Sequence, residues 1–558
     1  MGQKYNRLCM DDLPLEDIPL SEYPRMQLQR DSYLCLNGKW DLKISKSPKL
    51  PDEYNESVIV PFPIESALSG IEKELKKGEY IYYRKTFSIN KQFNKDRIIL
   101  HFDAVDQICE VYLNGYMVCK HEGGYLPFEV DITNVILDKN ELIVKVKDDL
   151  NKLYGYGKQA RKSKGMWYTK ISGIWKTCWI ESTPMNYFKK LKISTTLNKV
   201  TIEIDTKIKH KVLTLNGKKY KFDTNSIEIE IENPQYWTPD NPFLYYFTLK
   251  GEKDFIKSYF ALRTISCGMN NDYHCILLNN KPYFFNGLLD QGYFPDGILT
   301  PKTYRKYEDE ILALKKLGFN TLRKHIKIEA DYFYYLCDKL GMIVFQDFVN
   351  NGSYNYLGDT ILPNIGFVKR LKKGFNVKKE IKEQFKKETA QTIDMLYNHP
   401  SVVYYTIFNE GWGQFDADMM YDFVKSLDSS RIIDTTSGWF KSNKSDVISE
   451  HIYFKDIKFS KQNKPIILSE FGGYVFKILE HSYNLTNTYG YKTFKTIEDY
   501  QNALNKLYKE KILPYALKEL SGCIYTQVSD IEDETNGVFT YDRKVTKIIE
   551  PILLNINK

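Results

Sequence analysis

The sequence predicts a multidomain chain in which two β-sandwiches precede a (β/α)8 TIM barrel. Three observations support this prediction. The 558 residues exceed what one hydrophobic core usually organises. The first half of the chain consists of short, partly alternating apolar segments separated by turns, which is typical of β-sandwiches. After Gly268, longer apolar segments alternate with helical patterns, as in parallel α/β domains.

Residues 1–184 are expected to form an N-terminal jelly-roll sandwich. Their strand candidates are rich in Ile, Val, Tyr and Phe, and Leu-Asn-Gly (113–115) supplies a turn between two of them. The clearest strands are IYYRKTFSI (81–89), RIILHFDAVD (97–106), CEVYLNGYMV (109–118), ELIVKVK (141–147) and KTCWIEST (176–183).

Residues 185–268 continue with short strands and are expected to form a smaller, immunoglobulin-like sandwich. SIEIEI (226–231) alternates strictly between apolar and polar residues, so it predicts a strand with one solvated face.

Residues 269–558 contain eight candidate buried strands and are expected to form the barrel. The strand candidates are 283–292, 320–326, 342–348, 402–410, 431–439, 446–453, 465–472 and 523–530. The helix candidates are 302–318, 330–341, 378–398 and 504–522. The gap between the fifth and sixth strands is too short for a good helix, so one unit is expected to be degenerate. The link at 349–377 has the length of a lid or specificity loop. For its basic half, a solvent-exposed surface loop is an equally good interpretation.

The composition argues against several functional classes. The 79 basic residues stand against 71 acidic ones, and a net charge of +8 over 558 residues gives little reason to expect nucleic-acid binding. The nine scattered cysteines form no CxxC pair, which favours a reduced, cytoplasmic setting over a disulfide framework or a zinc site. We see no secretory signal at the N-terminus and no apolar run long enough for a membrane span.

The ends of the predicted barrel strands place two glutamates where TIM barrels hold their catalytic groups. Glu410 follows Asn409 at the end of the fourth strand, and Glu470 ends the seventh. Two carboxyl groups across a barrel mouth suit glycosidic cleavage, in which one protonates the leaving oxygen and the other attacks the anomeric carbon. Taken alone, Glu410 could instead be the first acid of a helix.

At this point the chain resembles glycoside hydrolase family 2, the β-galactosidase, β-glucuronidase and β-mannosidase group. The resemblance runs nearly end to end. It rests on YPRMQLQRDSYLCLNGKWDL (23–42), GGYLPFEVDIT (123–133), SGIWKTCWIE (172–181), YWTPDNPFLY (236–245), LGFNTLRKHIK (317–327), FNEGWGQF (408–415) and ILSEFGG (467–473). It implies that residues 1–184 form the family's sugar-binding sandwich and that the enzyme is a retaining exo-β-glycosidase.

The resemblance also implies roles for the two glutamates. Glu410 takes the place of the acid/base and Glu470 that of the nucleophile. The other candidates for substrate binding or support of the pair are polar or aromatic residues at strand ends. They are Asn409, Asp290, Arg323, His325, Trp439, His451, Tyr453 and Gln527. For most of them a packing, turn or ion-pair role is a comparable reading.

The sugar is less well defined than the reaction. The first strand continues as LLDQGYFPDG and the last as YTQVSDIEDETNGVF, where many family members have His-rich and Trp-rich segments. The Asn-x-Lys motif with which glucuronidases hold the sugar carboxylate has no clean equivalent, and Lys324 alternates away from Arg323 and His325. We therefore expect β-galactosidase-like action on a carbohydrate substrate, with β-glucuronide, β-mannoside, galactofuranoside or arabinoside as alternatives. A non-catalytic carbohydrate-binding protein is the alternative from another class. No metal or other cofactor is expected, and a homo-oligomer is possible.

Overall fold

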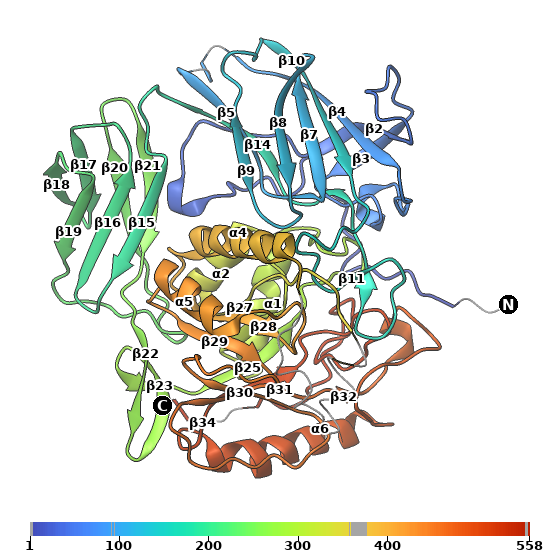
Figure 1. The fold of residues 1–558 in the computed structure, drawn as a ribbon, viewed down its shortest axis with the longest axis vertical. Helices are drawn as coiled ribbons and strands as arrows, with labels where there is room; N and C mark the ends of the chain where they lie inside the picture. The colour runs from blue at the N-terminus through green and yellow to red at the C-terminus, as the bar shows by residue number, and fades with distance from the viewer. Residues whose placement is uncertain are drawn as a thin grey trace.

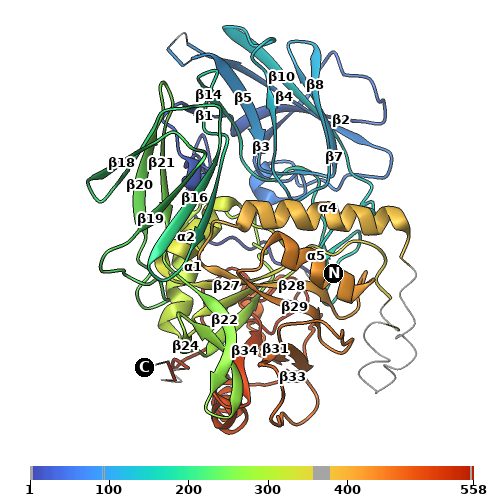
Figure 2. The ribbon, with the colours of Figure 1, turned by 60° about the vertical axis from the view of Figure 1, so that its left-hand side comes forward.

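The computed structural model describes residues 4–90, 92–93, 95–355, 358, 377–552 and 556–557. They form two β-sandwiches and an eight-stranded parallel barrel, so the predicted fold class is confirmed. Figures 1 and 2 show the N-terminal sandwich above the barrel, the second sandwich beside both, and the long helix α4 (Lys379–Leu396) between the first sandwich and the barrel.

The N-terminal sandwich packs a six-stranded antiparallel sheet against a four-stranded one. The six strands, in spatial order, are β3 (Glu56–Val60), β2 (Gly38–Ser45), β4 (Tyr80–Ser88), β10 (Lys139–Lys147), β7 (Ile108–Leu113) and β8 (Tyr116–Glu122). The four are β1 (Tyr33–Cys35), β14 (Cys178–Thr183), β5 (Arg97–Phe102) and β9 (Phe128–Asp131). Asn114 and Gly115 both have positive φ between β7 and β8, which confirms the predicted hairpin turn.

The second sandwich is smaller and has its own apolar core. One sheet contains β15 (Lys190–Thr195), β16 (Lys199–Asp205) and β19 (Ser226–Glu230), and the other contains β18 (Lys218–Phe222), β17 (Lys211–Leu215), β20 (Tyr245–Lys250) and β21 (Phe255–Phe260). In β19 the isoleucines face inward while Ser226, Glu228 and Glu230 are exposed, as the alternation predicted.

A three-stranded sheet leads into the barrel. It contains β22 (Ile265–Asn270), β23 (Tyr273–Leu278) and β24 (Lys281–Pro282), so the expected domain boundary at 268 falls inside β22. Ile276 and Leu278 of β23 pack with aromatic residues of the barrel lumen, where the rings of Phe345 and Tyr404 stack 4.2 Å apart. The N-terminal half of the lumen is therefore filled by side chains, which confines any site to the other end.

The barrel strands run parallel in the spatial order β29-β28-β27-β26-β25-β34-β31-β30. Their bounds are β25 (Phe285–Asp290), β26 (Thr321–Lys324), β27 (Ile343–Asp347), β28 (Val402–Asn409), β29 (Ile432–Ser437), β30 (Ile448–Ile452), β31 (Ile466–Gly472) and β34 (Leu520–Thr526). Seven lie within the predicted segments, and β34 begins three residues before its predicted segment and ends four residues earlier than predicted.

Helices α1 (Arg305–Lys316), α2 (Asp331–Leu340), α4, α5 (Ala417–Leu427) and α6 (Ile497–Leu507) connect the strands. We expected one connection without a helix. Two such connections exist, because residues 438–447 and 453–465 contain none. The prediction of a helix over 504–522 is wrong in its second half. The helix begins earlier, at Ile497, and gives way to tighter and wider turns around Pro514, whose ring cannot continue it.

The barrel has a seam between β29 and β30, where no backbone ladder joins the two fully described strands. Side chains bridge it. The hydroxyl groups of Ser437 and Ser449 lie 3.0 Å apart, and that of Ser469 on β31 lies 2.6 Å from Ser449. Hydroxyl groups thus join the three strands across the seam.

Residues 150–176 of the N-terminal sandwich extend onto the barrel mouth. They include β11 (Gln159–Ala160) and β12 (Tyr168–Thr169), and Figure 1 shows β11 above the C-terminal part of the barrel. The Tyr168 hydroxyl donates to Glu534 Oε2 over 2.5 Å, and the Thr169 amide donates to Glu532 Oε1 over 2.9 Å. Most of the loop 349–377, the expected lid or surface excursion, lies outside the described residues.

Candidate active site

The local backbone turns Glu410 into the barrel mouth. Glu410 directly follows β28 and has a φ of +50°, in the left-handed region, while its amide donates to the Ser437 carbonyl over 2.9 Å. The next helix begins only at Ala417. Glu410 is therefore not the first acid of a helix, and the alternative reading of this residue is excluded.

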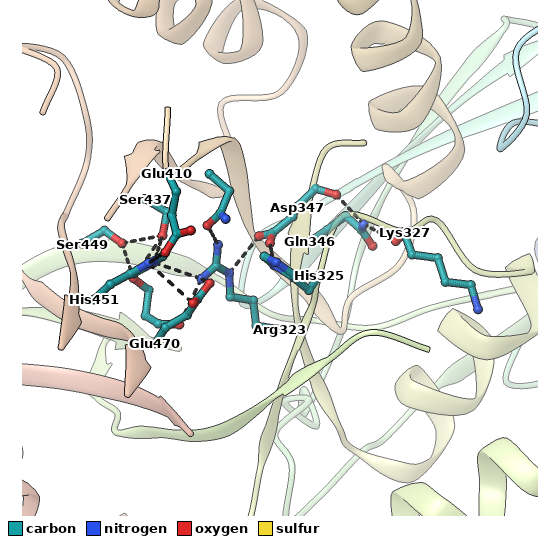
Figure 3. A network of polar contacts seen from close by, with 12 residues as sticks. Arg323, His325, Lys327, Gln346, Asp347, Glu410, Ser437, Ser449, His451 and Glu470 are labelled. Carbon is teal, nitrogen blue, oxygen red and sulfur yellow. Dashed lines mark hydrogen bonds and ion pairs between the residues drawn. The ribbon is translucent and has the colours of Figure 1, made fainter. Parts of the chain in front are cut away.

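Glu410 and Glu470 face each other across the mouth with His451 between them (Figure 3). His451 Nδ1 lies 2.8 Å from Glu410 Oε1 and 3.6 Å from Glu470 Oε2. One carboxylate oxygen of each glutamate and this nitrogen all lie within 4.8 Å of one another. The two glutamates are 8% and 5% exposed, so the pair is largely shielded from water.

Arg323 occupies the centre of the contact network and is almost fully buried. Its Nε is 3.0 Å from Asp347 Oδ1, and its Nη1 donates to Glu470 Oε1 over 3.1 Å. Its Nη2 donates to Asn409 Oδ1 over 2.9 Å. Because the Asn409 oxygen is engaged in this way, the amide nitrogen is the group left to donate to a ligand.

Glu470 receives a second donor from Tyr453, whose hydroxyl lies 2.6 Å from Oε2. The Tyr453 ring stacks on Tyr491 at 3.9 Å, which holds the hydroxyl in place. An arginine can only donate hydrogen bonds, so the contacts of Glu470 with Arg323 and Tyr453 suit a carboxylate rather than a carboxylic acid.

The tautomer of His451 follows from its neighbours. Its Nε2 lies 2.9 Å from the Ser437 hydroxyl and 3.4 Å from Arg323 Nη1, which is only a donor. Nε2 must therefore accept, and Nδ1 holds the proton and donates it to Glu410 Oε1. Burial lowers the pKa of His451 to about 3, although the charge of Glu470 opposes the shift. The imidazole is neutral at ordinary pH.

Glu410 differs electrostatically from its partner. Burial raises its pKa above the usual value, while the positive charges of Lys158, His325 and Arg323 oppose the shift. Because His451 donates to Oε1, the acidic proton of Glu410 is directed to Oε2. The geometry thus presents one carboxyl group with a raised pKa beside one that contacts only donors, which is the arrangement of a general acid and a nucleophile.

Gly438 makes this close packing possible. It has a φ of +96°, and a Cβ at this position would lie 3.2 Å from His451 Nδ1 and 3.4 Å from Cγ of Glu410. A side chain here would be strained at this φ and would press on the His451 ring, which contacts Glu410.

The structure brings most of the predicted residues together. His325 joins the network through Asp347, whose Oδ2 lies 2.7 Å from His325 Nδ1. Burial would raise the pKa of Asp347, but Arg323 and His325 lower it overall. The half-buried Trp439 meets the His451 ring edge-on at 5.5 Å. Their roles toward a sugar stay predictions.

Asp290 and Gln527 are not brought to the carboxyl pair. Asp290 Oδ2 lies 2.7 Å from Lys324 Nζ, and the register aligns these two residues on the outer wall of the barrel. This position gives no support to the sugar-binding role expected for Asp290. Gln527 donates to Asn536 over 2.9 Å, beside the contacts of β12. Sequence reasoning missed Lys158, since nothing local in the first sandwich indicates contact with the barrel.

The group of Glu410, His451 and Glu470 has the spacing of a metal site. Its chemistry argues for proton transfer instead. His451 Nδ1 holds the proton that it donates, and Arg323 already supplies the positive charge beside Glu470. Of the helices that the structure describes, none combines the length and apolarity needed to cross a membrane.

Comparison with known proteins gives one consistent family. The family model described as glycosyl hydrolases family 2, TIM barrel domain, matches residues 270–552. The models for the family 2 sugar binding domain and for glycosyl hydrolases family 2 match residues 15–184 and 182–263.

Individual relatives are distant. A β-galactosidase from Thermoanaerobacter pseudethanolicus is 24% identical over 383 residues, which cover 63% of this chain and 47% of that protein. A putative β-glucuronidase from Formosa agariphila is 24% identical over 386 residues, which cover 64% and 34%. The chain thus spans about half the length of these relatives or less.

Solved structures share the fold over nearly the whole chain. A β-D-glucuronidase from Dictyoglomus thermophilum has a TM-score of 0.74 at 20% identity, covering 96% of this chain and 97% of that one. A β-glucuronidase from an uncultured Clostridium species has a TM-score of 0.74 at 17% identity, covering 95% and 98%.

Proposed function

The chain belongs to glycosyl hydrolase family 2, and from this premise we propose that it is a retaining exo-β-glycosidase that uses Glu470 as nucleophile and Glu410 as acid/base. The observation that supports retention is the short distance between the carboxyl groups. Oxygens of the two lie within 4.8 Å, whereas inverting enzymes separate the groups by about 6.5 to 9.5 Å to admit a water, and retaining ones by about 5 to 5.5 Å.

In the first step, Glu470 attacks the anomeric carbon while Glu410 donates the Oε2 proton to the leaving oxygen. Arg323 and Tyr453 hold the attacking carboxylate in place. Asn409, whose amide oxygen accepts from Arg323, donates its amide nitrogen to a sugar hydroxyl beside the reacting carbon in this proposal.

The second step reverses the role of Glu410. Once Glu470 is bonded to the sugar, its negative charge is lost, and the pKa of Glu410 falls because a nearby like charge has gone. Glu410 then takes a proton from water, and that water releases the sugar with its original configuration. His451, neutral throughout, keeps Glu410 oriented in both steps.

The proposal is tested by following hydrolysis of a nitrophenyl β-glycoside by NMR. A retaining enzyme forms the β-anomer first, and Glu470→Ala abolishes turnover. With azide, Glu470→Ala should form the α-glycosyl azide and Glu410→Ala the β-glycosyl azide. An α-anomer as the first product of the wild type would overturn retention. A wild type inert on nitrophenyl galactoside, glucuronide, mannoside, galactofuranoside and arabinoside alike would favour the non-catalytic, carbohydrate-binding alternative.

The sugar predicted from the sequence is a β-galactoside. A β-glucuronide or another uronide is the second candidate, because a buried cation, Lys158, acts on the acid/base. The possible homo-oligomer and the cytoplasmic location are part of the same proposal. Light scattering after gel filtration tests the first, and fractionation of the native host tests the second.

A further inference from the structure

Lys158 is a buried lysine at the junction of the first sandwich and the barrel. It directly precedes β11 and is 7% exposed. Its carbonyl accepts from the Tyr168 amide over 3.0 Å, which joins it to β12. The backbone that carries Lys158 is therefore fixed, and β12 anchors it to the loop after β34.

Among the residues that the structure describes, the ammonium group of Lys158 has no ion-pair or hydrogen-bond partner. Every other buried lysine that the structure describes has a hydrogen bond or an ion pair. Lys324, for example, pairs with Asp290 and Glu329. The remaining ones are Lys170, Lys176, Lys211, Lys302, Lys327 and Lys547. Within the described part of the chain, Lys158 Nζ has only the face of the Trp167 ring, 5.5 Å from its centroid. Burying a charge without a partner is costly, so such a group is expected to have a function.

Ring contacts place Lys158 beside the segment that carries Glu410. Its ammonium lies over the Trp167 ring, and that ring meets the ring of Trp412, two residues after Glu410, with centroids 5.1 Å apart. Among the positive groups that lower the pKa of Glu410 against burial, Lys158 has the largest effect, ahead of Arg323. It also acts on His325 at the end of β26 and on Glu534 after β34. No ion pair within 4.0 Å forms between Lys158 and either glutamate in the described residues. The ammonium thus acts on Glu410 without forming an ion pair with it.

We propose that Lys158 recognises an anionic substituent of the substrate, namely a carboxylate on the sugar or on its leaving group. This inference rests on the proposed glycosidase function and adds a substrate class to it. A carboxylate would complete the missing ion pair of Lys158 by a charge-assisted hydrogen bond, which is roughly twice as strong as a neutral one. The specificity determinant would then lie on the sandwich and the catalytic pair on the barrel.

The test uses pairs of substrates that differ only in a carboxylate. One arm compares 4-nitrophenyl β-galactoside with the β-galacturonide and β-glucoside with β-glucuronide. The other arm compares 4-nitrophenyl β-galactoside with a β-galactoside whose nitrophenyl leaving group carries a carboxylate on its aromatic ring. The proteins are wild type, Lys158→Gln, Lys158→Arg and, as a matched control, Lys162→Gln, which removes an exposed lysine from the same segment.

We expect Lys158→Gln to lower kcat/KM for the carboxylated member by about 10- to 100-fold, mainly through KM, as for a lost hydrogen bond to a charged group. The loss on the neutral member, which reports the effect of Lys158 on Glu410, should be at least about 10-fold smaller. Lys158→Arg should recover part of the loss on the carboxylated member, and Lys162→Gln should behave as wild type. The arm that shows the effect identifies whether the carboxylate belongs to the sugar or to the leaving group.

An equal loss on neutral and carboxylated members would overturn the proposal, because Lys158 would then act through Glu410 or the fold. Equal activity of wild type and Lys158→Gln on every pair would overturn it as well, while leaving the glycosidase function intact. If the wild type cleaves nothing, the proposed function fails. Calorimetric titration with glucuronate and glucose then tests Lys158 separately, and equal affinities of wild type and Lys158→Gln for glucuronate would overturn the inference.

Discussion

Replacing Glu410 by Gln removes one proton and little else. The amide oxygen of Gln can accept from His451 Nδ1 as Glu410 Oε1 does over 2.8 Å, so the geometry of the mouth is kept. The change deletes the acid that protonates the leaving oxygen. Leaving groups that are stable anions need no such proton, whereas alkyl or sugar leaving groups depend on it.

The expected loss of kcat/KM equals the rate enhancement that a general acid provides. For a poor leaving group, such as a methyl or sugar aglycone, kcat/KM should fall by about 10² to 10⁴, or about 3 to 5 kcal/mol of transition-state stabilisation. For a dinitrophenyl glycoside, kcat/KM should change by less than about 10-fold, since departure of that group needs no proton.

The pH dependence gives a second, independent readout. Burial raises the pKa of Glu410, so wild-type activity should fall as the pH rises through that raised value. In Glu410→Gln this alkaline limb should disappear. The matched control is Glu388→Gln, because burial also raises the pKa of Glu388, to about 7, on α4 outside the catalytic network. Equal losses for all leaving groups, or an alkaline limb that persists in Glu410→Gln and vanishes in Glu388→Gln, would refute the assignment.

Three further predictions concern stability and packing. Glu388 has a raised pKa, so it binds a proton more tightly when folded. The contribution of Glu388 to the free energy of unfolding should therefore fall by a few kcal/mol as the pH rises from about 4.5 to about 7. In urea unfolding, Glu388→Gln should lose less stability than the wild type over this pH range. His451 has a lowered pKa, so its contribution is present above pH 6.5 and is lost as the pH falls toward about 3. His451→Gln should show a weaker acid dependence in the same assay. Gly438→Ala should lower kcat by at least about 10-fold with folding retained by circular dichroism, because the new methyl group meets His451 and Glu410; unchanged kcat would contradict this.

Much of the barrel could be predicted because its strands are buried on both faces and read as continuous apolar runs. The rule that catalytic groups lie at strand ends then predicted that Glu410 and Glu470 lie close together, although they are far apart in the sequence. Arg323 and His451 followed from strand alternation alone. The helix expected over 504–522 failed because apolar spacing continues past Pro514, where the backbone cannot follow it.

Two further residues show what a single strand does not reveal about its neighbours. Asp290 looked like Arg323, a charged residue at a strand end, but the register pairs Leu289 with Arg323 and Asp290 with Lys324. The alternation of side chains along one strand does not show which of its residues share a face with Arg323 on the neighbouring strand; that depends on the register between the two strands. Lys158 could not be found because its environment is made by a second domain, and no local pattern encodes a contact between segments some 250 residues apart.

The serines at the seam between β29 and β30 hold the barrel closed by side-chain contacts, where the other strand pairs use backbone hydrogen bonds. Where most of the cylinder is held by main-chain bonds that any sequence can make, its closure beside Glu410 depends on the side chains of Ser437, Ser449 and Ser469. Ser437 also holds the neutral imidazole that orients the acid. The same small hydroxyl groups therefore close the barrel and support the orientation of the acid/base. A substitution at any of these three serines should disturb both.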